Sequence, residues 1–153
     1  WYSTPSFHPG HNPRKISHEE AARQTNGAVI SDALLRKGSG RLIYLYYRQN
    51  GIWPEEVSGF DRTTIAEKIV PFEPVRNVTA DYPPTLLIHG RNDTDVPFEQ
   101  STMMAKQLSK KGVPFLLKPI KNGEHMFAGG DPQQIKDAYK TMREFIIKYL
   151  ESD

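Results

Sequence analysis

The C-terminal half of the sequence predicts an α/β fold in which parallel strands alternate with helices. The segment PPTLLIHG, residues 83–90, is an apolar run bounded by prolines and a glycine, which is typical of a strand covered on both faces. A second apolar run, VPFLLKPI at 113–120, follows a stretch of helical periodicity. Strand, helix, strand and helix in this order predict a right-handed crossover between neighbouring parallel strands.

Two helices are expected to pack against these strands. The first spans 97–111, begins with a proline that suits the first turn of a helix, and ends at Gly112. The second follows Asp131, an expected N-cap residue, with Pro132 at its first position and Gln134 as the expected capping-box partner. The apolar side chains of this last helix fall on one face, namely Ile135, Ala138, Tyr139, Met142, Phe145, Ile146 and Tyr149.

The N-terminal half predicts an irregular segment followed by short helices. Residues 1–16 contain three prolines and a glycine among histidines and serines, a composition that favours loop over helix or strand. Ser17 and Glu20 have the spacing of a capping box, in which each side chain accepts a backbone amide of the other residue. A short helix is therefore expected to begin after Ser17 and to end near Gly27.

Three further segments complete this half of the chain. Two apolar groups within 28–49, separated by KGSG, predict two helices joined by a glycine turn. The stretch WPEEVSGFD at 53–61 is expected to be a turn-rich link. Thr63 or Thr64 then suits the cap of a short helix that runs through Ile69.

Composition argues against several classes of partner. Twenty basic and 18 acidic residues give a net charge of +2 without a block of one sign, so no nucleic acid partner is expected. The sequence contains no Cys, which rules out disulfides and thiolate metal sites and favours a reducing, cytoplasmic compartment. No apolar run approaches the roughly 18 to 20 residues that span a bilayer, so no membrane partner is expected.

Two loops that follow the predicted strands carry side chains suited to catalysis. Asp93 and Asp95 lie in the loop after the strand that ends at Gly90, named here the acid loop. His125 lies in the loop after the strand that ends near Ile120, named here the histidine loop. Functional groups of a parallel sheet gather beyond the carboxyl ends of its strands, and sequential parallel strands are usually neighbours. Asp93 and His125 are therefore expected to lie side by side, where the carboxylate fixes the tautomer of the imidazole and stabilises its protonated form.

Each of these residues also has a purely structural interpretation. Asp93 taken alone suits a solvated turn, and Asp95 is expected to be a loop or helix-cap residue, with support of the acid loop as the alternative. His89, beside the strand end, is expected to be a packed residue. His8 and His11 are separated by Pro-Gly and lack the helix that would direct both to a metal, and NDTD lacks the Gly and Glu of a calcium loop.

The acid loop carries an extended motif, PPTLLIHGxxDxxVPxxQSxxM, which is followed by LxxxGV and by a histidine. This pattern resembles the C-terminal part of an α/β-hydrolase of the esterase and prolyl-oligopeptidase-like kind. The resemblance implies that Asp93 is the triad acid and His125 the triad base. It also implies that 81–153 is a core segment and that 1–80 is an N-terminal segment with a helical cap or lid. The implied enzyme needs no cofactor and acts on a small ester or peptide substrate, with a carboxylesterase favoured over a peptidase.

The nucleophile of this family is missing from the sequence. The family serine lies in G-x-S-x-G, and the stretches around Ser39 and Ser58, KGSGR and EVSGF, do not have this spacing. With Trp1 in place of an initial Met, the chain is therefore expected to be a fragment that does not complete acyl transfer by itself. The alternative is a non-catalytic interaction or assembly module, and the unpaired strand edge of a half-sheet predicts self-association or strand exchange.

Overall fold

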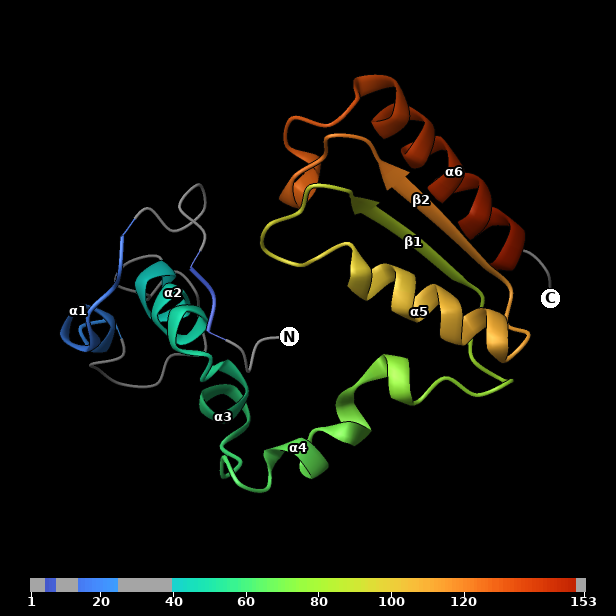
Figure 1. The fold of residues 1–153 in the computed structure, drawn as a ribbon. Coiled ribbons are helices and arrows are strands. Elements are labelled where there is room, and N and C mark those ends of the chain that lie inside the picture. The colour runs from blue at the N-terminus through green and yellow to red at the C-terminus, as the bar shows by residue number, and fades with distance from the viewer. Residues whose placement is uncertain (1–4, 8–13, 25–39, 151–153) are drawn as a thin grey trace. The chain divides into compact units, whose positions relative to one another are not determined.

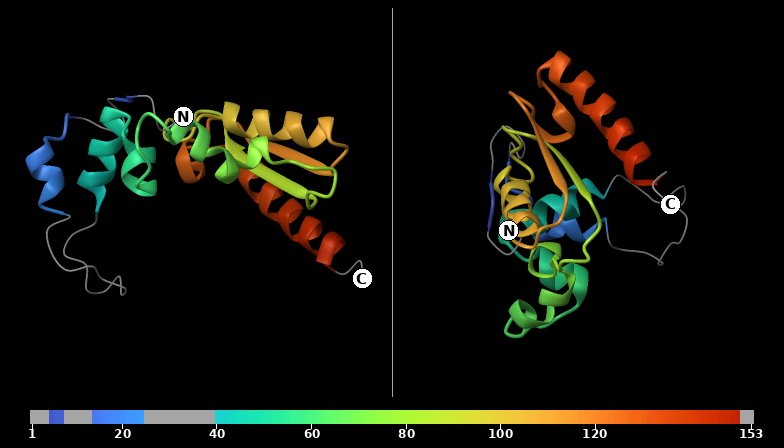
Figure 2. Two further views of the ribbon diagram at one scale, coloured as in Figure 1. Left: turned by 90° about the horizontal axis from the view of Figure 1, so that it is seen from below. Right: turned by 90° about the vertical axis from the view of Figure 1, so that its right-hand side faces the viewer.

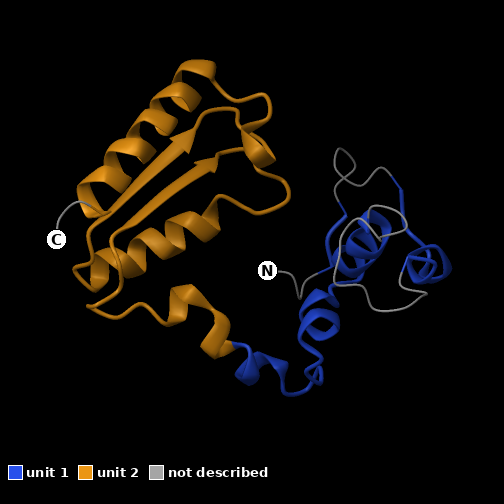
Figure 3. Ribbon diagram, turned by 180° about the vertical axis from the view of Figure 1, so that it is seen from behind, with its two compact units in different colours: residues 1–69 blue, residues 70–153 orange. Residues whose placement is uncertain are grey.

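The computed structural model describes residues 5–7, 14–24 and 40–150 of the chain (Figure 1). The chain divides into two compact units, Trp1–Ile69 and Val70–Asp153 (Figure 3). Unit 2 is an α/β layer and unit 1 is helical where it is described.

The sheet of unit 2 has two parallel strands, β1 (Thr85–Gly90) and β2 (Phe115–Ile120). Helix α5 (Glu99–Lys110) connects them, and helix α6 (Pro132–Leu150) follows β2. The two helices lie on opposite sides of the sheet (Figures 1 and 2). The predicted alternation of strand and helix is confirmed, and with it a partial α/β fold in which both strands end at the same edge.

The start of α6 is bound to the end of β2. The Asp131 carboxylate caps the helix, since its Oδ1 accepts the amide of Gln134 at 2.8 Å. The side chain of Gln134 was expected to return to the Asp131 backbone in a capping box. It instead accepts the amide of Lys121 at 2.8 Å, and the Asp131 amide donates to the Lys121 carbonyl at 3.0 Å. The expected capping box is therefore replaced by hydrogen bonds between the start of α6 and the residue that follows β2.

The main core of unit 2 lies between α5 and the sheet. Val78, Leu108 and Val113 are buried there, with Leu87 and Met104 packed against them. Two short 3-10 helices precede β1, at Val70–Phe72 and Pro74–Arg76. Residues 70–80 were expected to belong to the N-terminal segment with the cap. In the structure they are part of unit 2, because Val78 completes the core under α5.

Unit 1 contains four described helices. They are α1 (His18–Ala22), α2 (Arg41–Asn50), α3 (Trp53–Ser58) and α4 (Ile65–Lys68). The capping box of α1 is confirmed: Ser17 Oγ accepts the Glu20 amide at 3.2 Å, and the Glu20 carboxylate accepts the Ser17 amide at 3.1 Å. A small core of Ile16, Ala21 and Leu45 joins α1 to α2.

Two expectations for unit 1 need correction, and a third concerns residues that the structure does not describe. The stretch 53–61, expected to be a link, contains α3, because a proline in the first turn and a left-handed glycine at Gly59 (φ 70°) define a helix start and end. Helix α1 ends at Ala22, before the predicted Gly27. The helix expected before KGSG lies outside the described residues. No helix in the described part of the chain is long and apolar enough to cross a membrane.

Candidate active site

Two glycines let the ends of the strands approach each other closely. A Cβ atom on Gly90 would lie 2.3 Å from the carbonyl oxygen of Gly123, a distance that no side chain tolerates. The backbone of the loop after β1 also bonds to the loop after β2. The amides of Arg91 and Asn92 donate to the carbonyls of Ile120 and Gly123, at 3.0 and 2.9 Å. The two loops expected to carry the site are therefore held against each other by their backbones.

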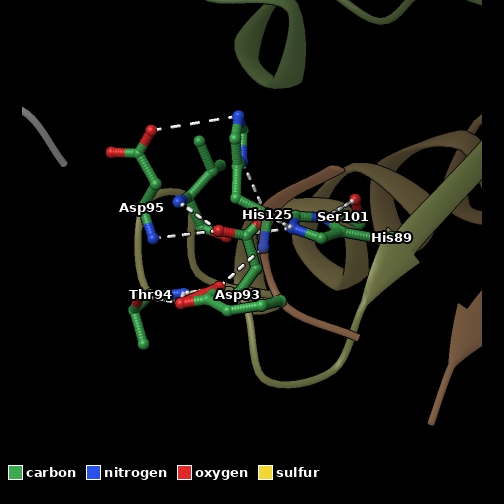
Figure 4. Close-up of polar contacts among 8 residues, drawn as sticks. His89, Asp93, Thr94, Asp95, Ser101 and His125 are labelled. Carbon is green, nitrogen blue, oxygen red and sulfur yellow. Dashed lines mark hydrogen bonds and ion pairs between the residues drawn. The ribbon is translucent and has the colours of Figure 1, made fainter. Parts of the chain in front are cut away.

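The structure brings Asp93 and His125 together at this edge (Figure 4). His125 Nδ1 lies 3.1 Å from Asp93 Oδ2, which is hydrogen-bond distance. The carboxylate accepts, so Nδ1 carries the proton of this bond. The Asp93 side chain is 6% exposed and the His125 side chain is 45% exposed. A buried acid thus holds an imidazole that remains open to solvent.

Asp93 is fixed by further donors and stays ionised. Its Oδ1 accepts the amide of Asp95 at 2.9 Å and the amide of Val96 at 2.8 Å. Burial by itself raises the pKa of the Asp93 carboxyl. The hydrogen bonds from the Val96 amide, the His125 ring and the Asp95 amide outweigh that effect, so the pKa lies below its ordinary value. The group therefore carries its charge at neutral pH.

The side chain of Glu124 forms hydrogen bonds that connect the acid loop to the histidine loop. Its carboxylate accepts the Thr94 amide at 2.8 Å, the Thr94 hydroxyl, and the amide of His125 at 2.6 Å. Burial raises the pKa of Glu124, and the hydrogen bonds from Thr94 and His125 lower it below its ordinary value. Sequence reasoning missed this residue, because nothing in the sequence indicates that the acid before His125 faces the loop after β1.

Asp95 lies close to the other nitrogen of the imidazole. Its Oδ2 is 3.9 Å from His125 Nε2, and its side chain is 15% exposed. Asp95 was expected to be a loop or helix-cap residue. The structure adds a contact with His125 to that interpretation, because the carboxylates of both Asp93 and Asp95 lie beside its ring (Figure 4).

His89 is packed, as expected, but it also contacts the acid. Its side chain is 13% exposed. Its Nε2 lies 2.9 Å from the Val96 carbonyl oxygen and 3.2 Å from Asp93 Oδ2, and its Nδ1 lies 2.7 Å from Ser101 Oγ. The sequence held one signal for this contact. His89 directly precedes the final glycine of β1, so its side chain belongs to the same sheet edge as Asp93.

In the described part of the chain, neither the candidate Ser58 nor Ser101, which lies near the site, is paired with His125. Ser58 Oγ donates to the Pro54 carbonyl at 2.5 Å and accepts the Phe60 amide at 3.1 Å, as a helix-end hydroxyl does. Ser101 Oγ bonds to His89. Ser39 lies outside the described residues, as do His8 and His11.

Comparison with known proteins identifies related chains. The model of the prolyl oligopeptidase family matches residues 34–153. Among solved structures, a truncated form of a carbohydrate esterase from gut microbiota is similar, with 29% sequence identity and a TM-score of 0.41. That match covers 47% of this chain and 25% of that chain, so it spans a quarter of the esterase structure. No curated protein sequence matches the chain.

Proposed function

The chain belongs to the prolyl oligopeptidase family, which consists of serine hydrolases with an α/β-hydrolase fold, and on this premise we propose that Asp93 and His125 form the acid and base of its Ser-Asp-His triad. The observation that supports the proposal is the bond between His125 Nδ1 and the buried Asp93 carboxylate. Both residues lie beyond the carboxyl ends of adjacent parallel strands, where α/β enzymes carry their sites.

In the proposed mechanism His125 acts as general base and then as general acid. With Nδ1–H bound to Asp93, Nε2 carries the lone pair that takes the proton of a serine hydroxyl. The serine oxygen then attacks the carbonyl carbon of the ester, and the negative charge of Asp93 stabilises the imidazolium. His125 returns the proton to the departing alcohol, and a water molecule activated in the same way hydrolyses the acyl-enzyme.

The proposed substrate is a small carboxylic ester. The same acyl-serine chemistry cleaves peptide bonds, so a peptidase of the prolyl-oligopeptidase-like kind is the alternative within the family. Parallel assays with p-nitrophenyl acetate and with a proline-containing peptide p-nitroanilide distinguish the two, since the first releases p-nitrophenol only when the ester is cleaved and the second releases p-nitroaniline only when the amide is cleaved.

A fluorophosphonate probe, which labels activated serines, tests the proposal directly. We expect no adduct on the 153-residue chain, because its sequence contains no G-x-S-x-G serine. In a form of the protein that carries a G-x-S-x-G serine, we expect stoichiometric labelling of that serine, and we expect His125→Ala to abolish it.

Intact-mass measurement and peptide mapping give the readout, and circular dichroism confirms that each sample is folded. Labelling of any serine within the 153 residues would show that the nucleophile is misplaced in this proposal. Labelling of the G-x-S-x-G serine that survives His125→Ala would show that His125 is not the base.

The exposed edge of the sheet supports a second candidate, a module that assembles with copies of itself. Within the described residues β1 pairs only with β2, which leaves its other edge without a strand partner. Helix α6 also exposes Tyr139, Ile146 and Leu150. We therefore expect the 153-residue chain to self-associate. Sedimentation velocity over a micromolar concentration series measures this, and a monomer throughout the series contradicts it.

A further inference from the structure

His89 connects the acid loop to two rigid elements of unit 2. It belongs to β1, and its Nδ1 bonds to Ser101 in the first turn of α5 at 2.7 Å. Its Nε2 faces two oxygen atoms of the intervening loop, the Val96 carbonyl at 2.9 Å and Asp93 Oδ2 at 3.2 Å. One imidazole thus joins a strand, a helix and the carboxylate of the proposed acid (Figure 4).

The partners of this ring decide which nitrogen carries its proton. Neither the Val96 carbonyl nor the ionised Asp93 carboxylate has a proton to donate, so Nε2 must be the N–H nitrogen. The Ser101 hydroxyl is able to donate, and in the neutral ring it donates to the lone pair of Nδ1. Ser101 therefore favours the Nε2–H tautomer, the form that donates to the acid loop.

Packing holds the ring in the orientation that these bonds need. The side chain is 13% exposed, and its ring meets Phe98 edge to face, with 5.7 Å between centroids and an interplanar angle of 73°. The guanidinium of Arg91 covers the same Phe98 ring, 5.1 Å from its centroid. Rotation of His89 away from Asp93 would break its contact with Phe98 as well as three polar contacts.

We propose that His89 is a positioning residue that holds the Asp93 carboxylate in the orientation in which it accepts from His125. Asp93 Oδ2 lies between the two imidazoles, 3.2 Å from His89 Nε2 and 3.1 Å from His125 Nδ1. Nε2–H of His89 donates to Oδ2 and so keeps this oxygen turned toward His125. The other oxygen, Oδ1, accepts the backbone amides of Asp95 and Val96 in the same loop. The inference rests on the triad roles proposed above for Asp93 and His125.

Two amide variants of His89 separate the donor from the bulk of the ring. The terminal nitrogen of Gln reaches about the position of imidazole Nε2, whereas the shorter Asn side chain ends near Nδ1. His89→Gln therefore keeps a donor for Asp93 and Val96 and gives up the bond to Ser101. His89→Asn keeps a polar group beside Ser101 and loses the donor to Asp93 and Val96.

Amide hydrogen exchange of the 153-residue chain, measured by NMR, reports whether Asp93 keeps its place. The amides of Asp95 and Val96 bond to Asp93 Oδ1, so their exchange accelerates if the carboxylate turns away. The Thr94 amide of the same loop bonds to Glu124 instead and is an internal control. In His89→Asn we expect the Asp95 and Val96 amides to exchange at least about tenfold faster, with Thr94 little changed.

The Gln variant and the wild-type ring complete the test. We expect His89→Gln to keep the exchange rates of Asp95 and Val96 within about threefold of wild type, and we expect ¹⁵N shifts to show the Nε2–H tautomer of His89. The proposal is overturned if the amides of Asp95, Val96 and Thr94 exchange faster by the same factor in both variants. It is also overturned if this happens in folded His89→Gln alone. An Nδ1–H tautomer of His89 in the wild-type chain overturns it as well. Unchanged rates in His89→Asn overturn it too. If His89→Asn does not fold, His89→Gln decides by the same amides.

These measurements need no enzymatic activity, so they separate the inference from the function on which it rests. Loss of order at Asp93 in His89→Asn supports the positioning role whatever reaction the site performs. Failure of the fluorophosphonate test would remove the triad assignment and leave the measured exchange rates unaffected.

Discussion

Replacing Asp93 with Asn is expected to lower kcat for ester hydrolysis by about 10⁴-fold, with a much smaller change in KM. The amide oxygen of Asn still suits the backbone donors of Asp95 and Val96, which directs the NH₂ group toward the imidazoles. That group is a donor, and it opposes the Nδ1–H of His125. The ring then carries its proton on Nε2 and has no lone pair to receive the proton of the serine.

Steady-state hydrolysis of p-nitrophenyl acetate measures this effect, in a form of the protein that carries the G-x-S-x-G serine. Asp137→Asn is the matched control, because the same chemical change there affects only a surface bond to Gln133 on α6. We expect the control to keep kcat within about twofold, since a surface substitution far from the site has little effect. A folded Asp93→Asn enzyme that retains a tenth or more of its kcat contradicts the proposed role.

The parts of the fold that the sequence predicted are those with a local physical signal. Apolar runs bounded by proline and glycine predicted β1 and β2, and the alternation with helices predicted that both loops meet at one edge. That edge was enough to place Asp93 beside His125. The capping box at Ser17 was predicted for the same reason, because its two bonds join residues only three positions apart.

The parts that could not be predicted depend on contacts between distant residues. Glu124 bonds to Thr94 although a helix and a strand, α5 and β2, separate them in sequence, and Gln134 reaches the end of β2 although a local partner was available. Neither contact has a periodicity or a spacing that a sequence pattern records. The turn after His125 is a further case, because Met126 and Phe127 adopt positive φ angles of 58° and 65°, a region in which residues with side chains are uncommon.

The conformation of this turn is determined by hydrogen bonds at the site and not by the backbone preferences of Met126 and Phe127. Left-handed backbone at residues other than glycine costs of order 1 kcal/mol or more, and it persists only where surrounding contacts determine it. Here the Glu124 amide donates to the Ala128 carbonyl at 2.8 Å and closes the loop. The Glu124 side chain binds the His125 amide. The loop is therefore shaped by the bonds that direct His125 toward Asp93.

Gly90→Ala is expected to destabilise unit 2 by about 3 kcal/mol or more, a large part of the 5 to 15 kcal/mol by which domains are usually stable. The new methyl group would lie 2.3 and 2.7 Å from the carbonyl oxygen and carbon of Gly123, and 2.8 Å from the carbonyl oxygen of Glu124. These are backbone atoms, so no side-chain rotation relieves the clash. Urea unfolding followed by far-UV circular dichroism measures the loss.

Gly112→Ala is the matched control for this substitution. It ends α5 with φ of 73°, and an added Cβ would meet no atom within 4 Å. Its cost is therefore the conformational strain alone, about 1 kcal/mol. A loss for Gly90→Ala no larger than for Gly112→Ala would show that the strand ends are able to separate without penalty. The expected larger loss of stability for Gly90→Ala means that the close approach of Gly90 to Gly123, which leaves no room for a side chain, sets the distance between the acid loop and the histidine loop.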